Sequence, residues 1–247
     1  MPRIIPIVPA GQSASAPVAG KGEFIAPPPL ALYVHIPWCV RKCPYCDFNS
    51  HEARAEIPEA EYLAALEADI LFALPQVWGR RIGSVFFGGG TPSLLSAEGL
   101  DRLLTSIRTL LPLQPDAEIT LEANPGSAEA GKFAAFRAAG VNRLSLGIQS
   151  FDGGHLQALG RIHDGDEARR AIELAARHFD NFNLDLMYGL PGQSLEQALV
   201  DVDTALGFAP THLSCYQLTL EPNTAFAAAP PELPESDICA DMQEAIE

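Results

Sequence analysis

The sequence predicts an α/β fold, a partial (β/α)6 barrel with parallel strands. Six apolar, strand-like segments alternate with longer segments of helical period, and such steps require parallel strands joined by helical crossovers. The glycine-rich and polar motifs follow the strands, which is where barrels place their functional residues. No GxGxxG motif opens the first helix, which disfavours a dinucleotide-binding fold.

Each step consists of an apolar strand and the helix after it. In the first step, residues 30–36 form the strand, and residues 58–74 place Leu63, Leu66 and Ile70 at helical spacing. Ser96 has the chemistry of an N-cap for the second helix. The other strands are expected at 82–87, 118–121, 143–146, 182–187 and 212–218, and the other helices at 96–111, 127–139, 155–159, 166–178 and 195–208.

The 247 residues have room for one large α/β domain with flanking segments. Residues 1–28, which are rich in Pro, Gly, Ser and Ala, are expected to form a flexible N-terminal extension. Residues 29–222 form the predicted barrel, and residues 223–247 are expected to start a C-terminal helical region. Because the helix expected at 235–247 has no terminating glycine, we expect the natural protein to continue beyond it.

Composition narrows the classes of partner. The net charge of −15 argues against non-specific binding to nucleic acid or to an anionic membrane, since both need basic surface. No apolar run reaches about 18 residues, so no membrane span is expected. Three of the five cysteines share one loop, which does not indicate a disulfide framework, and Cys215 and Cys239 are expected to be ordinary thiols. This usage predicts a cytoplasmic protein.

Cys39, Cys43 and Cys46 follow the first strand with the spacing C-x3-C-x2-C. Thiolates are the usual ligands of iron–sulfur clusters, and three of them can hold three corners of a cubic cluster while the fourth iron stays open to a small molecule. Zinc is the structural alternative, with His35 or His51 as a fourth ligand. Zinc sites usually contain Cys or Cys/His pairs of another spacing, so the sequence favours the cluster.

Other motifs also follow strands. The run Gly-Gly-Gly-Thr-Pro at residues 88–92 lacks Cβ atoms at three positions, which lets the backbone come close to a ligand. Glu122, Gln149 and Asp185 are polar residues at or near the ends of later strands. Because the carboxyl ends of parallel strands meet at one mouth of a barrel, we expect these groups to lie close to the cysteines.

Together these motifs resemble the radical S-adenosylmethionine (SAM) enzymes, and more narrowly their coproporphyrinogen III dehydrogenase group. The resemblance covers residues 30–246 and implies a radical-SAM-type barrel. The six motifs that carry it, in order, are Tyr33-Val-His-Ile-Pro-Trp-Cys39, Gly88-Gly-Gly-Thr-Pro-Ser93, Glu122-Ala-Asn-Pro125, Ser145-Leu-Gly-Ile-Gln-Ser-Phe151, Leu159-Gly-Arg161 and Asp185-Leu-Met-Tyr-Gly-Leu-Pro191.

The resemblance implies a [4Fe–4S] cluster on the three cysteines, with SAM at the open iron. Tyr33 and His35, which alternate on one face of the first strand, are implied to lie beside the cluster or SAM and are candidate catalytic residues. From the residues alone, a core His35 satisfied by a hydrogen bond is the alternative. The residues implied to bind SAM are Tyr33, Tyr45, Gly89, Gly90, Thr91, Glu122, Gln149, Arg161 and Asp185.

One position separates two branches of this group. The oxidising enzymes carry C-x3-C-x2-C-x-C, and the last cysteine position is Phe48 here. The segment Cys46-Asp-Phe-Asn-Ser50 instead resembles the haem chaperone (HemW-type) branch, which implies binding of haem and its delivery to a recipient haem protein. The alternative is an oxygen-independent coproporphyrinogen III oxidase that makes protoporphyrinogen IX with the help of an electron donor. A homodimer is one assembly that the sequence allows.

Overall fold

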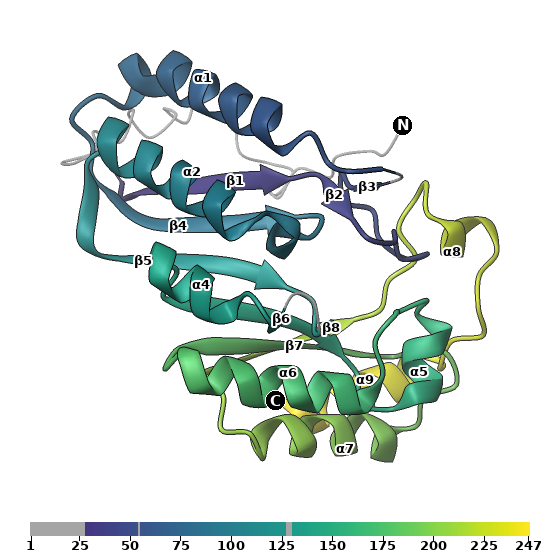
Figure 1. The fold of residues 1–247 in the computed structure, drawn as a ribbon. Coiled ribbons are helices and arrows are strands. Elements are labelled where there is room, and N and C mark those ends of the chain that lie inside the picture. Colours follow the sequence, from purple (N-terminus) through teal and green to yellow (C-terminus); the bar gives the residue numbers. More distant parts are fainter. Residues whose placement is uncertain (1–27, 54, 127–129) are drawn as a thin grey trace, which may run out of the picture.

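The computed structural model describes residues 28–53, 55–126 and 130–247. Its main sheet has six strands in the order β1-β4-β5-β6-β7-β8, and every neighbouring pair is parallel, which confirms the predicted partial barrel (Figure 1). The strands are β1 (Leu30–Ile36), β4 (Ile82–Gly89), β5 (Leu113–Ala123), β6 (Arg143–Gln149), β7 (Phe182–Tyr188) and β8 (His212–Gln217).

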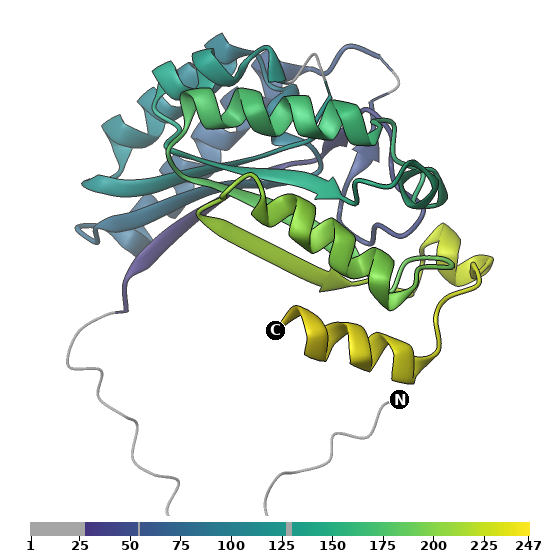
Figure 2. The same cartoon turned by 90° about the horizontal axis from the view of Figure 1, so that it is seen from below.

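Helices pack on one face of this curved sheet, and the loops at the strand ends gather on one side of it (Figures 1 and 2). A short parallel ladder, β2 (Trp38–Cys39) with β3 (His51–Glu52), lies at that end. The helices are α1 (Glu59–Val77), η1 (Pro92–Leu94), α2 (Ala97–Leu110), α4 (Phe133–Ala139), α5 (Gly153–Ala158), α6 (Gly165–His178), α7 (Leu195–Leu206), α8 (Ala225–Ala228) and α9 (Ser236–Ile246).

Some boundaries differ from those expected. β5 starts at Leu113, five residues early, because a register irregularity in its ladder with β4 accommodates residues 114–117, which lack apolar alternation. α1 continues to Val77 with Pro75 inside it. The helix expected at 127–139 begins as α4 at Phe133, and residues 127–129 lie outside the described part.

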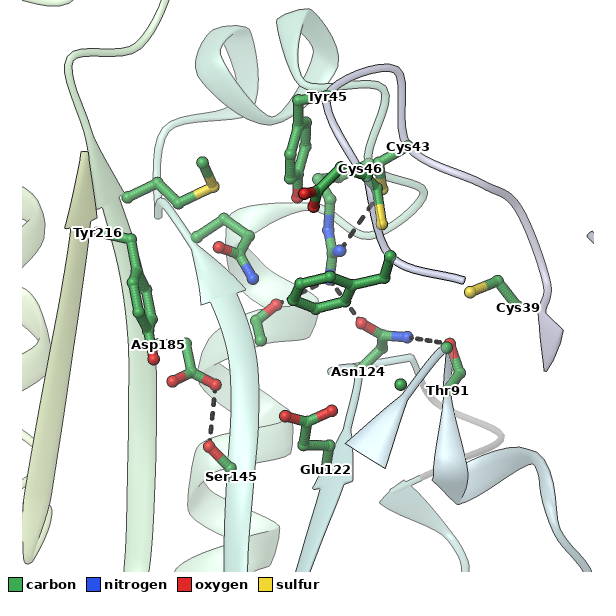
Figure 3. A pocket seen from close by; sticks show the side chains of 18 of the residues that line it. Cys39, Cys43, Tyr45, Cys46, Thr91, Glu122, Asn124, Ser145, Asp185 and Tyr216 are labelled. Carbon is green, nitrogen blue, oxygen red and sulfur yellow. Dashed lines mark hydrogen bonds between the residues drawn. The ribbon is translucent and has the colours of Figure 1, made fainter. Parts of the chain in front are cut away.

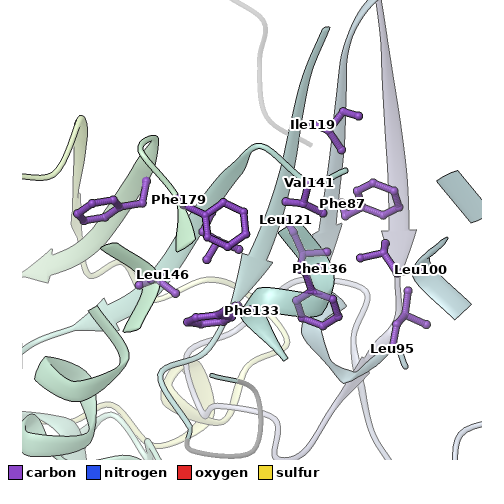
Figure 4. Close-up of a cluster of buried hydrophobic side chains, with 14 of the residues drawn as sticks. Phe87, Leu95, Leu100, Ile119, Leu121, Phe133, Phe136, Val141, Leu146 and Phe179 are labelled. Atoms are coloured by element: carbon purple, nitrogen blue, oxygen red, sulfur yellow. The ribbon is translucent and has the colours of Figure 1, made fainter. Parts of the chain in front are cut away.

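The hydrophobic core lies between the sheet and its helices (Figure 4). Alternate strand residues, such as Phe87, Leu121 and Leu146, are fully buried against helix residues such as Phe133 and Phe136. The apolar period of the strands therefore fixes which of their faces the helices cover.

Two of the helices start with capping boxes, α6 at Asp164 and α7 at Ser194. In each capping box, side chain and backbone satisfy each other's hydrogen bonds.

The opposite face of the sheet carries the other set of alternating residues, and many of these are polar. In the ladder register Glu122 lies beside Ser145, and Asp185 beside Ser214. These side chains point away from the apolar core and toward the strand ends where the loops gather. The sheet therefore presents a polar surface next to the cysteine loop.

Of the predicted extension at residues 1–28, only residue 28 is described. In the predicted C-terminal region, α8 follows β8 and α9 packs against α7. The domain boundaries at 28/29 and 222/223 stay predictions. Among the described residues, no helix combines the length and the apolar character that a membrane span requires.

Candidate functional site

A pocket of about 380 Å³ lies at the carboxyl ends of the strands, between the cysteine loop, the end of β7 and the segments that follow β4, β5, β6 and β8 (Figure 3). Its position is the one at which parallel barrels place their active sites. The sequence-predicted residues that line it are Cys39, Cys43, Tyr45, Cys46, Gly89, Gly90, Thr91, Glu122, Gln149, Arg161 and Asp185.

The cysteine loop is closed by its own backbone and one lysine. Cys39 ends β2, and the Cys46 N–H donates to the Cys43 carbonyl at 3.1 Å in the turn that follows. The Lys42 ammonium donates to the carbonyls of Phe48 (2.9 Å) and Ser50 (3.0 Å), which ties the two ends of the loop together. Three thiols are thus presented from one compact segment.

The donor set fits a cluster better than a single ion. Cys39 is set apart from Cys43 and Cys46, although all three line one pocket (Figure 3). In the described ranges, no three His, Cys, Asp or Glu side chains converge on one metal position. A cubic cluster carries its thiolates on separate irons, so its ligands surround a volume rather than a point. Burial raises the pKa of the Cys39 thiol, so metal binding here must displace a proton.

The two histidines considered as zinc ligands are engaged elsewhere. His35 Nε2 donates to the Asn49 carbonyl at 2.9 Å, and His51 Nε2 lies 3.2 Å from the Asn49 side-chain oxygen. Neither ring lines the pocket with the thiols. A Cys₃His zinc site would require both the loop and a ring to rearrange.

The glycines at the end of β4 are needed for contact between two segments of the protein. A Cβ on Gly89, whose φ is +112°, would lie 2.5 Å from the His35 ring, and one on Gly90 would lie 2.5 Å from the Trp38 carbonyl oxygen. The N–H groups of Gly90 and Thr91 donate to the carbonyls of Ile36 and Trp38, both at 2.7 Å. The absent side chains therefore let the β4 loop join the cysteine loop, while the glycine backbone lines the pocket.

Asn124, which is not among the residues predicted from the sequence, connects three parts of the site. Its amide nitrogen donates to the Thr91 hydroxyl at 3.1 Å, and its oxygen accepts from the Arg161 guanidinium at 2.6 Å. The same guanidinium donates to the Gly147 carbonyl at 2.8 Å and lies 3.7 Å from the Cys43 sulfur. The sequence did carry a signal for Asn124, namely its position before Pro125 at a strand end.

Two half-buried carboxyl groups face the pocket, Glu122 from β5 and Asp185 from β7, with β6 between these two strands (Figure 3). Burial raises the pKa of Glu122 to about 7, together with the charge of Asp185 and against a hydrogen bond from the Gly89 backbone. Burial also raises the pKa of Asp185, although Ser145 (2.9 Å) and Asn183 (2.7 Å) donate to its oxygens. Such groups accept hydrogen bonds from hydroxyl or ammonium groups of a ligand.

Tyr45 and Gln149 also line the pocket. The Tyr45 ring packs 6.3 Å from the Phe226 ring, and burial raises the pKa of its phenol. Gln149 has a φ of 68°, which is uncommon for a residue other than glycine. Its amide nitrogen would lie 3.0 Å from a Cβ on Gly147, so the side chain folds over that glycine beside Arg161.

Tyr33 and His35 do not line this pocket. The Tyr33 ring stacks on Phe86 at 6.2 Å and is 56% exposed. Since the Asn49 carbonyl can only accept, a neutral His35 carries its proton on Nε2, and the Tyr33 hydroxyl donates to Nδ1 at 3.1 Å. His35 is thus hydrogen-bonded, as in the alternative that the sequence left open, but it is half-buried and not part of the core, and a catalytic role for either residue stays a prediction.

Known proteins share this sequence and fold. The chain is 53% identical over 218 residues to the haem chaperone HemW of Escherichia coli, which covers 88% of this chain and 58% of that protein. It is 43% identical over 218 residues to the mitochondrial radical S-adenosyl methionine domain-containing protein 1 of Mus musculus. That match covers 86% of this chain and 49% of the mouse protein. The structure of coproporphyrinogen III oxidase (HemN) from E. coli, a radical SAM enzyme, matches with a TM-score of 0.79 and 33% identity over 88% of this chain and 51% of that one.

This chain therefore spans just over half the length of its curated HemW relatives. The family model described as the radical SAM superfamily matches residues 33–205, a range that holds the three cysteines and every other predicted site residue. The cofactors of that family are a [4Fe–4S] cluster and SAM, and the thiol set and polar pocket fit both. The chain belongs to the radical SAM superfamily.

Proposed function

We propose that this chain is the cofactor-binding part of a haem chaperone, which holds a [4Fe–4S] cluster, SAM and haem and delivers haem to a haem protein. The observation that carries the proposal is its 53% identity over 218 residues to HemW of E. coli, against 33% to the HemN structure. Phe48 supports the same choice, because the oxidising enzymes are expected to carry cysteine there.

Within the pocket, each cofactor has a proposed set of partners. Cys39, Cys43 and Cys46 hold the cluster, which when bound supplies a one-electron donor and an open iron for SAM. The backbone around Gly89, Gly90 and Thr91 receives the methionine part of SAM, and Tyr45 packs on its adenine. The polar residues proposed to fix the ribose and carboxylate of SAM are Glu122, Gln149, Arg161 and Asp185, with Tyr33 nearby on β1.

The charges of the pocket suit this division. Arg161 lies between Asn124 and the Cys43 sulfur, so its cation offsets the negative charge of a thiolate-ligated cluster and can also meet a carboxylate. Glu122 and Asp185 line the part of the pocket formed by β5 and β7, where their carboxyl oxygens can accept hydrogen bonds from ribose hydroxyls. Phe48, Met187 and Leu218 give the pocket an apolar part that suits a flat macrocycle.

A second function has one observation in its favour. The HemN structure matches at a TM-score of 0.79, and that protein is a coproporphyrinogen III oxidase. An enzyme of that type would convert propionate side chains of coproporphyrinogen to the vinyl groups of protoporphyrinogen IX. The fold is compatible with either function, so sequence identity and Phe48 decide the preference.

Finer features of the proposal follow from the chaperone function. We place the protein in the cytoplasm, where a reducing environment protects free thiols and a cluster. Its partners would be a recipient haem protein and an electron donor, and its assembly a homodimer. The net charge of −15 disfavours nucleic acid as a partner.

Haem titration set beside a turnover assay tests the choice. The anaerobically reconstituted chain should bind haem. During the titration, the absorbance of the haem should change until a fixed ratio of haem to protein is reached. With SAM, a reductant and coproporphyrinogen III it should form no protoporphyrinogen. Turnover would contradict the chaperone function, and so would a failure to bind haem. Cys215→Ala, at a half-buried thiol outside the pocket, serves as the control for handling damage.

A further inference from the structure

Gln149 is held in a costly backbone conformation at the edge of the pocket. Its φ of 68° lies in the left-handed region, and the β6–β7 ladder shifts register between Gly147 and Gln149. A residue other than glycine adopts this conformation only where its surroundings impose it, and such strain collects at functional sites. The strain implies that other residues hold Gln149 in place.

Those residues lie on both sides of Gln149 in the chain. Immediately before it, the Ile148 carbonyl accepts from His163 Nε2 at 3.1 Å. Immediately after it, the Ser150 hydroxyl donates to Asp201 at 2.6 Å, and the Phe151 N–H donates to the other carboxylate oxygen of Asp201 at 2.8 Å. The neighbours of the strained residue are therefore fixed on either side.

Asp201 is the most distant member of this arrangement. It lies on α7, fifty residues along the chain, and is only 3% exposed. Both of its carboxylate oxygens are used on the segment that follows Gln149. A buried carboxylate is costly unless such hydrogen bonds satisfy it, so the contact is specific to this segment.

We propose that Asp201 is a positioning residue that acts through Gln149: it holds residues 150 and 151 so that Gln149 keeps its left-handed conformation and its amide faces the SAM pocket beside Arg161. The inference rests on the proposed SAM site. SAM affinity would then depend on a residue of α7, which lies behind the sheet, as well as on the residues that line the pocket.

A double-mutant cycle tests the proposal, with SAM affinity measured on the reconstituted 247-residue chain. Asp201→Asn removes one of the two carboxylate oxygens that accept from Ser150 and Phe151. It should weaken SAM binding about tenfold, which corresponds to the loss of one good hydrogen bond. Gln149→Gly removes the side chain that Asp201 positions. In the Gln149→Gly background, Asp201→Asn should therefore change SAM affinity by less than about twofold.

Two further variants guard the result. Ser150→Ala removes only one of the two contacts and should act in the same direction if Asp201→Asn folds poorly. Asp203→Asn, at an exposed carboxylate on the same helix, is the matched control and should leave SAM affinity unchanged. An equal loss for Asp201→Asn in both backgrounds, no loss at all, or an equal loss for Asp203→Asn would each overturn the proposal.

Thermal unfolding separates this proposal from the proposed function. Gln149→Gly relieves the left-handed strain and should raise Tm by about 2–4 °C for a chain of this size. A lower Tm would contradict the strain that the proposal requires, whatever SAM does. If the wild-type chain binds no SAM, the proposed function fails, and the role of Asp201 in SAM affinity fails with it.

Discussion

The two faces of the six-stranded sheet are made by the same strands but by different chemistry. On the helix-covered face, residues such as Phe87, Leu121 and Leu146 have no exposed surface. On the other face, Asn183 and Asp185 belong to a hydrogen-bonded set, while Tyr216 is 56% exposed. One face contributes most of the stability, and the other provides the groups for a ligand.

The contrast shows how a strand pattern of period two serves both needs at once. Because successive side chains point to opposite faces, the apolar set can fill a core while the polar set faces the pocket. Part of the polar set is hydrogen-bonded within itself: Asn183 donates to Ser145 (2.9 Å) and accepts from Ser214 (3.1 Å). Substitutions on the two faces should therefore have different consequences.

The largest effect is expected in the core. Phe136→Ala should lower the free energy of unfolding by about 3–5 kcal/mol, because a fully buried ring leaves a cavity between α4 and the sheet. Urea unfolding measures it. Phe72→Ala, at a ring 77% exposed on α1, is the matched control and should change stability by less than about 0.5 kcal/mol. Equal losses would remove the contrast between buried and exposed apolar groups.

A pH-dependent gain is expected on the polar face. The pKa of Glu122 is raised to about 7, so its favourable contribution is present below its unfolded pKa and is lost as pH rises through 7. Glu122→Gln should stabilise the chain by about 1–3 kcal/mol at pH 8 and hardly at all at pH 4. The groups that face it are Asp185, Tyr33 and the Gly89 N–H.

Urea unfolding at the two pH values measures this gain. Glu173→Gln, at an exposed carboxylate on α6, is the control and should change the free energy of unfolding by less than about 0.5 kcal/mol. If Glu122→Gln destabilises the chain at pH 8, Glu122 is stabilised as an anion and the buried-carboxyl account of the pocket is wrong.

A smaller loss is expected where the polar set is interrupted. Asn183→Ala should cost about 1–3 kcal/mol at pH 8, since Ser145, Asp185 and Ser214 each lose a partner in a buried place. Asn183→Asp keeps the size but adds a charge beside Asp185, so its loss should be larger at pH 8 than at pH 4. Denaturation at both pH values would show it, and equal stability of all three chains would contradict it.

The smallest effect is expected at the open edge of the polar face. Tyr216→Thr keeps a strand-forming residue on β8 and should change stability by less than about 0.5 kcal/mol, because the tyrosine is 56% exposed. Calorimetry of the free chain measures it. A loss above about 2 kcal/mol would mean that this face contributes to stability like the core does.

The sequence predicted the barrel because its signals are local. Alternation and helical period in segments such as 82–87 and 166–178 need no knowledge of distant contacts. The start of β5 was missed because residues 114–117 pair only through an irregular register. The Gly-Gly-Gly motif was noticed, but its contact with His35 and Trp38 depends on how the β1 and β4 loops meet.

The residues of the site could be predicted from the sequence only where a motif or the end of a strand indicated them. Eleven residues expected at the barrel mouth line one pocket, whereas Tyr33 and His35 do not. Asn124, Ser145 and Asp201 were missed because their roles depend on hydrogen bonds to residues about 33–51 positions away. No pattern in a single sequence reports such pairs.

The most direct measurement is the response of the reconstituted cluster to SAM. Iron and sulfide analysis should give about four of each per chain, and SAM should perturb the electron paramagnetic resonance spectrum of the reduced cluster. The triple Cys39→Ala, Cys43→Ala, Cys46→Ala variant should lose both signals, while Cys215→Ala keeps them. Zinc in place of iron, or a cluster whose spectrum ignores SAM, would contradict the account.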